Sequence, residues 1–110
     1  MRGRARDNGQ MTEASTAEVL GALADNTQLR GYLRGGLIEA IPAKRSRRLL
    51  LLAEIAQAFE PGVRYSERQV NDVLRALHPD YATLRRYLVD EQLMNRASGE
   101  YWRIGGPVRC

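Results

Sequence analysis

Arginine is the residue type through which this sequence is best equipped to bind another molecule. Sixteen of the seventeen basic residues are arginine, and the formal net charge is +4. A guanidinium can hold a phosphate or a guanine edge through two parallel hydrogen bonds, which a lysine ammonium cannot do. Residues 1–43 hold five arginines against five acids, so the whole excess of positive charge lies in residues 44–110. This distribution favours an anionic partner for the second part of the chain.

The densest basic cluster lies where a helix is expected to begin, and it consists of Lys44, Arg45, Arg47 and Arg48. Positive charge at a helix N-terminus opposes the helix dipole by ~0.3–1 kcal/mol for each group, so the cluster is not there to help the helix form. Phosphate contact and a simply solvated helix end explain the pattern equally well. Other basic residues that could contact phosphates are Arg64, Arg68, Arg96 and Arg103.

Residue sets for catalysis or metal binding are missing from the sequence. Cys110 is the single cysteine and His78 is the single histidine, which excludes an internal disulfide and argues against a cysteine-based metal site or nucleophile. No glycine-rich phosphate loop and no nucleophile with a matching base is apparent. We therefore expect a protein that is not an enzyme and that needs no cofactor and no metal.

The apolar residues have the abundance and distribution of a soluble globular protein. They make up 44% of the sequence, and no apolar run approaches the ~20 residues that a membrane span needs. The arginines at the start of the chain are followed by no apolar segment, so a secretory signal is not supported. We expect no membrane partner and a cytoplasmic location.

The elements that would position the arginines are clearest near the C-terminal end. Apolar side chains repeat at helical spacing behind a good N-cap at Asp80, which predicts a helix over residues 80–92. The apolar period then changes to two on either side of an Ala-Ser-Gly turn, which predicts a β-hairpin over residues 94–104. Trp102 falls on the apolar phase of the second strand and is therefore expected in the core.

The predicted helix over residues 80–92 carries the candidates for contacts with base edges in a DNA major groove, and they are Thr83, Arg85 and Arg86. Alternatively, Arg86 could simply pair with Asp90, four residues further on the same face. Three carboxylates outweigh two arginines in this segment. Because its own charge is net negative, the helix cannot hold DNA by itself, and the affinity for DNA would have to come from the arginines around it.

The preceding segments have the patterns of a helical core. Residues 49–59 are apolar around most of a helix, which predicts the central core helix, and residues 63–65 can form a short strand. A capping box that begins at Ser66 predicts a helix over residues 67–77. Only three residues separate that helix from the next one, as expected in a helix-turn-helix.

The first part of the chain is divided by changes in composition. Residues 1–15 show no periodicity and are predicted to be a disordered arm. Residues 16–36 are predicted to form two short helices, the second ended by Gly35 and Gly36. Residues 37–41 are consistent with a short strand or an extended linker.

These elements together predict a single domain over residues 16–106, with its core in residues 37–106 and a short tail at residues 107–110. The fold class is mainly α with a small β component. Specifically, we expect a winged helix-turn-helix with a C-terminal β-hairpin wing and extra N-terminal helices.

Four blocks of sequence carry a resemblance to a known family: IPAKRSRR at 41–48, FEPGVRYSERQVN at 59–71, DYATLRRYLVDEQLMNR at 80–96 and GEYWR at 99–103. Through them, residues 36–106 resemble a small bacterial domain family of unknown function, found alone or fused behind winged-helix transcriptional regulators. The resemblance implies a winged-helix-like domain of bacterial regulators.

A shorter block upstream, EVLGALADNTQLR at residues 18–30, resembles the opening of the arsenic-repressor class of metal-sensing regulators. No cysteine or histidine follows where that class keeps its metal ligands, so metal sensing is not implied.

Two functions follow as hypotheses. The first is a transcriptional regulator that binds duplex DNA through the winged helix-turn-helix. The second is a protein-interaction or dimerisation module without DNA binding of its own, which would act in a homodimer or with a partner regulator. An exposed apolar face on the N-terminal helices would favour the second hypothesis, and its residues would be Val19, Leu20, Leu23 and Leu33.

Overall fold

The structure is a computed structural model of the 110-residue chain, and it describes residues 16–106. The predicted arm at residues 1–15 and the predicted tail at residues 107–110 lie outside the described residues. Within them, no helix combines the length and the apolar character needed to cross a membrane.

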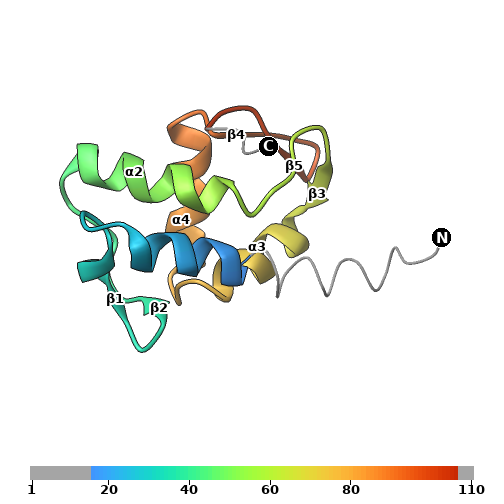
Figure 1. Ribbon diagram of the computed structural model, residues 1–110. Coiled ribbons are helices and arrows are strands. Elements are labelled where there is room, and N and C mark those ends of the chain that lie inside the picture. The colour runs from blue at the N-terminus through green and yellow to red at the C-terminus, as the bar shows by residue number, and fades with distance from the viewer. Residues whose placement is uncertain (1–15, 107–110) are drawn as a thin grey trace.

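The described chain is a compact α+β arrangement with two small antiparallel sheets (Figure 1). Residues 16–25 are helical. The elements that follow are the 3-10 helix η1 (Arg30–Tyr32), β1 (Leu33–Arg34), β2 (Leu37–Ile38), α2 (Arg45–Ala56), β3 (Arg64–Ser66), α3 (Glu67–Arg75), α4 (Tyr81–Asp90), β4 (Met94–Ala97) and β5 (Glu100–Arg103).

The three-stranded sheet has the strand order β3-β5-β4. The last strand in the chain, β5, lies in the centre and pairs antiparallel with both neighbours, so that Tyr101 is opposite Tyr65 on one side and Arg96 on the other. The helices α3 and α4 lie in the chain between β3 and the β4–β5 hairpin. The pairing of β3 with β5 therefore joins the chain before α3 to the chain after α4, and it holds the β4–β5 hairpin next to the two helices.

The start of each of these helices is capped as the sequence predicts. Ser66 Oγ accepts a hydrogen bond of 3.1 Å from Gln69 N, and Gln69 Oε1 accepts one of 2.8 Å from Ser66 N, which completes the predicted capping box of α3. Asp80 caps α4 by accepting from Thr83 N at 3.3 Å and from Thr83 Oγ1 at 2.8 Å. Thr83 is thus a capping partner rather than a free surface residue.

The hydrophobic core is built around α2, as the sequence predicts. Leu52, Ile55 and Ala56 of this helix are fully buried, together with Phe59 in the turn that follows. The Phe59 ring packs edge-on against the Tyr65 ring of β3, with 5.2 Å between centroids. Figure 1 shows α2 and the helical residues 16–25 in front of α4, with the three-stranded sheet at one end of the molecule.

The second predicted N-terminal helix is wrong. The segment contains one turn of 3-10 helix, η1, and then the short β1–β2 hairpin. Gly35 and Gly36 have φ angles of +61° and +81°, so they form the turn itself instead of following a helix. Two successive residues with positive φ make the tight turn whose twist matches antiparallel strands. The short strand predicted within residues 37–41 is present as β2.

The small hairpin is attached to the junction between α3 and α4. Ile38 N donates a hydrogen bond of 3.0 Å to Leu77 O, and His78 Nδ1 lies 2.7 Å from Ile38 O. The single histidine, which is buried, therefore has a structural role.

Candidate nucleic-acid interface

A groove of about 370 Å³ lies between α4 and the β4–β5 hairpin. Its lining residues are Ala82, Arg85, Arg86, Val89, Asp90, Arg96 and Tyr101. Three of these are arginines and only one is a carboxylate, so the groove carries net positive charge. The structure therefore brings the predicted candidates Arg85, Arg86 and Arg96 together from two successive elements, α4 and β4.

Arg86 lies on the exposed side of α4 and faces this groove. The ion pairs among residues 16–106 do not include one between Arg86 and Asp90, the alternative that the helical spacing allowed. The charge of Arg86 helps to keep the pKa of the Asp80 carboxyl low, although the hydrogen bonds from Thr83 are the main cause. Arg86 is thus available to an incoming anion.

Arg85 is held more tightly at the edge of the same groove. Its Nη1 donates to Asn71 Oδ1 of α3 and lies 3.7 Å from Glu67 Oε2. The side chain is only 23% exposed. Sequence reasoning did not select Glu67, because nothing in a helical or strand period shows that the first residue of α3 meets a residue of α4.

On the other side of the groove, Arg96 lies against Tyr101. Arg96 Nη1 donates to the Tyr101 hydroxyl at 3.4 Å, and the guanidinium carbon is 5.9 Å from the centre of the ring. The Tyr101 hydroxyl donates in turn to Glu67 Oε1 at 3.2 Å. Tyr101 was also missed, because the apolar phase of the last strand was assigned to Trp102.

The faces of β5 are the reverse of the prediction. Tyr101 and Arg103 are buried, whereas Trp102 is partly exposed and Ile104, just after the strand, is 51% exposed. The alternation itself was correct, but the period does not reveal which phase points inward. Tyr101 is the inward residue because it lies opposite Tyr65, which packs on Phe59.

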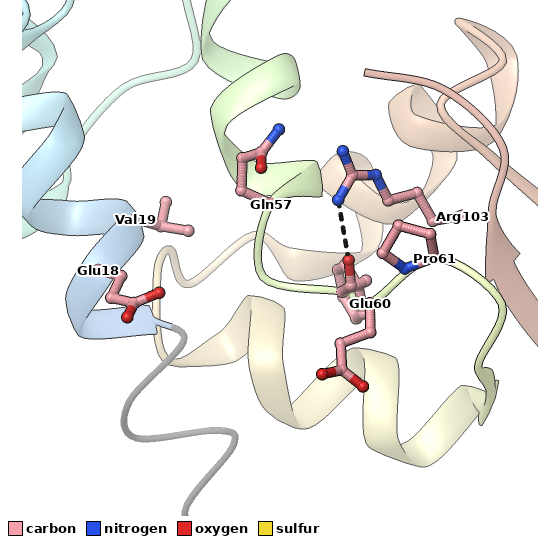
Figure 2. A pocket seen from close by; sticks show the side chains of 7 residues that line it. Glu18, Val19, Gln57, Glu60, Pro61 and Arg103 are labelled. Atoms are coloured by element: carbon pink, nitrogen blue, oxygen red, sulfur yellow. Dashed lines mark hydrogen bonds between the residues drawn. The ribbon is translucent and has the colours of Figure 1, made fainter. Parts of the chain in front are cut away.

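Arg103 does not belong to the basic surface, contrary to the prediction. It is 8% exposed, and it donates from Nη1 to Phe59 O at 3.1 Å (Figure 2). Its Nε donates to Gly105 O at 3.0 Å. Burial lowers the pKa of its guanidinium. Its charge is used to fasten the turn after α2 to the end of β5.

Most of the basic cluster at the start of α2 is also occupied within the protein. Arg45 binds the Glu91 carboxylate through Nε at 3.2 Å and Nη2 at 2.7 Å. Arg47 donates to Gln28 O at 3.3 Å. Arg48 donates to Ala43 O at 2.9 Å, and its guanidinium carbon lies 4.7 Å from the centre of the Tyr87 ring. These partners explain the cluster without phosphate, while Lys44 is exposed.

Two further predicted residues lie in β3 and in the first turn of α3. Arg64 stacks on Trp102 at 4.0 Å from the ring centre and lies 3.6 Å from a Glu100 carboxylate oxygen. Both partners are on the face of the sheet opposite Tyr101, so Arg64 does not reach the groove. Arg68 is exposed in the first turn of α3, and the described part of the chain supplies no ion pair for it.

A second pocket, of about 300 Å³, lies between the helical residues 16–25 and the turn after α2 (Figure 2). Its charged lining residues are Glu18, Glu60 and Arg103. Because its lining holds two carboxylates and one guanidinium, which is already bound to backbone carbonyls, this pocket lacks the positive charge of the groove. No group of three potential metal ligands occurs within residues 16–106.

The fold and the groove together define a small α+β protein with an arginine-lined surface between a helix and a hairpin. The chain belongs to a bacterial family described as an uncharacterized protein conserved in bacteria (DUF2087), whose family model matches residues 37–103, more than half of the sequence. Comparisons with curated proteins and with solved structures find no match.

This membership confirms the bacterial domain of unknown function that the sequence blocks indicated. The match provides no link to transcriptional regulators, and it begins after the leader that resembled the arsenic-repressor class. Residues 18–25 of that leader are helical, and only its last residue, Arg30, belongs to η1.

Proposed function

We propose that this protein binds duplex DNA as a winged helix-turn-helix, with α4 as the recognition helix and the β4–β5 hairpin as the wing. The order of the elements supports this proposal: α2, β3, α3, α4, β4 and β5, with β3 paired to β5. In this arrangement α3 and α4 are the helix-turn-helix, and α4 enters the major groove.

The observation that carries the proposal is the arginine-lined groove beside α4. Arg86 is placed to read base edges, because it is exposed and has no ion pair within residues 16–106. In this proposal Arg96, which lines the groove, and Arg68, which is exposed at the start of α3, contact backbone phosphates. Such contacts position the protein on DNA, whereas Arg86 supplies the sequence preference.

Contacts within the protein remove the main electrostatic objection to α4 as a recognition helix. The Glu91 carboxylate is neutralised by Arg45 and its side chain is 15% exposed. The Asp80 carboxylate is used as the cap of the helix. Of the three carboxylates in this segment, Asp90 alone lines the groove, where three arginines outweigh it.

The alternative, an interaction module that docks through an apolar N-terminal face, lacks the observation that would favour it. Val19 is 2% exposed and Leu23 is fully buried. Leu20 and Leu33 are partly buried and pack against the core. The apolar side chains of this region are therefore used within the molecule.

The test is binding to a pool of random duplexes over a series of salt concentrations. Because phosphate contacts release counterions, we expect affinity to fall steeply as salt rises. Absence of binding even at low salt, or affinity that does not respond to salt, would refute the proposal.

The variant Arg86→Ala distinguishes recognition of the base sequence from contacts with the phosphate backbone. We expect it to lose about 1–3 kcal/mol of discrimination at the bases it contacts and to flatten the selected sequence motif. Arg34→Ala is the matched control, because this substitution removes the same charge at a different place. Arg34 is 78% exposed and lies in β1, outside the lining of the groove. Equal effects of the two variants on sequence preference would show that Arg86 does not read bases.

A further inference from the structure

Glu67, the first residue of α3, contacts α4 and the β4–β5 hairpin through two residues that line the groove, Arg85 and Tyr101. Its backbone N donates to Gly99 O in the turn of the wing at 3.2 Å. Its carboxylate accepts from the Tyr101 hydroxyl at 3.2 Å through one oxygen and lies 3.7 Å from Arg85 Nη1 through the other. The first residue of α3 therefore touches both walls of the groove.

The position of this carboxylate places it in competition with an incoming anion. Arg85 lines the groove, and its guanidinium is shared between Asn71 and Glu67. A phosphate that approaches Arg85 from the groove must compete for the same cation. The Glu67 side chain is 50% exposed, so it can yield to a stronger anion. An ion pair of this exposure is weak, and a phosphate can displace it.

We propose that Glu67 is a positioning residue that restrains anion binding in the groove by competing with phosphate for Arg85. The inference rests on the proposed function and adds its regulation. Glu67 lowers affinity for any single phosphate and thereby suppresses binding to DNA that engages Arg85 alone. A duplex that also engages Arg86 and Arg96 supplies enough binding free energy to overcome the competition, so Glu67 raises the number of contacts that binding requires.

The contact with Tyr101 extends the effect to the wing. Arg96 lies on the Tyr101 ring and donates to the same hydroxyl that donates to Glu67. When a phosphate draws Arg85 away, the carboxylate keeps its contact with Tyr101. The wing therefore stays in place while the guanidinium changes partner.

The variant Glu67→Gln tests this role, because the amide removes the charge but still accepts a hydrogen bond from Tyr101. We expect random duplex to bind roughly two- to fivefold more tightly, the range given by the loss of a weak exposed ion pair. The slope of log affinity against log salt should become steeper by about one, since one more cation engages phosphate. Preference for the selected sequence should stay unchanged, because a phosphate contact contributes equally on every duplex.

Glu100→Gln is the matched control. Glu100 is 54% exposed and lies 3.6 Å from Arg64, so its environment resembles that of Glu67, but it is on the opposite face of the sheet. Its loss should leave the salt slope unchanged. Equal tightening by both variants would mean that only net charge matters, and weaker binding by Glu67→Gln would mean that the carboxylate supports binding. Either result overturns the inference.

Tripolyphosphate binding followed by nuclear magnetic resonance separates this inference from the function on which it rests. If the unmodified protein binds no duplex, the DNA function fails. The role of Glu67 then stands only if Glu67→Gln binds tripolyphosphate more tightly than both the unmodified protein and Glu100→Gln. Glu67→Ala, which also loses the Tyr101 contact, should lower the melting temperature more than Glu67→Gln, which loses only the charge.

Discussion

At the scale of single residues, the arginines of the last hairpin divide into two kinds. Arg96 lies on an exposed strand and lines the groove, whereas Arg103 is buried and holds backbone carbonyls. The difference comes from their partners. A guanidinium satisfied by carbonyl oxygens of its own chain is part of the framework, while one on an exposed strand can meet a ligand.

Substituting each of these two arginines with methionine should separate stability from binding. Arg103→Met leaves the buried Phe59 carbonyl without its donor, so we expect a loss of about 1–3 kcal/mol in the free energy of unfolding. Arg96→Met should change stability by less than about 0.5 kcal/mol, as at most surface sites, and should weaken DNA binding. Urea denaturation and duplex titration of both variants measure these effects. A destabilised Arg96→Met would contradict this division.

The sequence could reveal that arginine was the important residue type, but not which arginines face solvent. The period of β5 assigns Trp102 and Tyr101 to opposite faces without saying which face is inside. That choice depends on Tyr65, a residue of another strand. Similarly, Arg45 pairs with Glu91 and Arg48 lies against the Tyr87 ring, and no local pattern predicts contacts with residues so far along the chain.

At the scale of elements, local signals were reliable where one residue determines the geometry. The capping residues Ser66 and Asp80 correctly placed the starts of α3 and α4. The glycine pair at 35 and 36 was placed correctly but given the wrong role, because the same residues can end a helix or form a hairpin turn. The pairing of β3 with β5 determines the strand order of the three-stranded sheet. It joins two strands that are separated in the sequence by α3 and α4.

The contact between Arg45 at the start of α2 and Glu91 at the end of α4 should make stability depend on pH. The hydrogen bond from Arg45 lowers the pKa of the Glu91 carboxyl, so the folded state favours its ionised form. This contribution is fully present above the ordinary glutamate pKa of about 4.3 and is lost as the pH falls through the lower folded value.

The comparison that measures it is the melting temperature of the unmodified protein and of Glu91→Gln between about pH 7 and pH 3, the range in which a glutamate titrates. We expect the variant to melt lower near neutral pH and the difference to vanish in acid. A difference that is constant across this range would show that the ion pair does not contribute.

At the scale of the whole molecule, the folded unit is larger than the segment that defines the family. The family match covers residues 37–103, yet Val19, Leu23 and Leu29 are part of the same hydrophobic core. The N-terminal part is therefore an integral layer of this protein. We expect the cooperative unfolding unit to include it.

Leu23→Ala tests this integration. Leu23 is fully buried, so its truncation should cost about 2–5 kcal/mol in the free energy of unfolding. Leu20→Ala is the control, because Leu20 is only partly buried and should cost less. Urea denaturation followed by circular dichroism gives both values. If Leu23→Ala unfolds with unchanged stability, the N-terminal helix is not part of the cooperative unit.

The placement of Trp102 provides an optical reporter within the protein itself. It is the single tryptophan of the chain, it lies on the face of β5 opposite Tyr101, and the Arg64 guanidinium covers its ring. Its fluorescence therefore reports the state of one hairpin without any label. Because the groove is on the other face of that sheet, a change in emission on ligand binding would signal movement of the hairpin rather than direct contact with the indole.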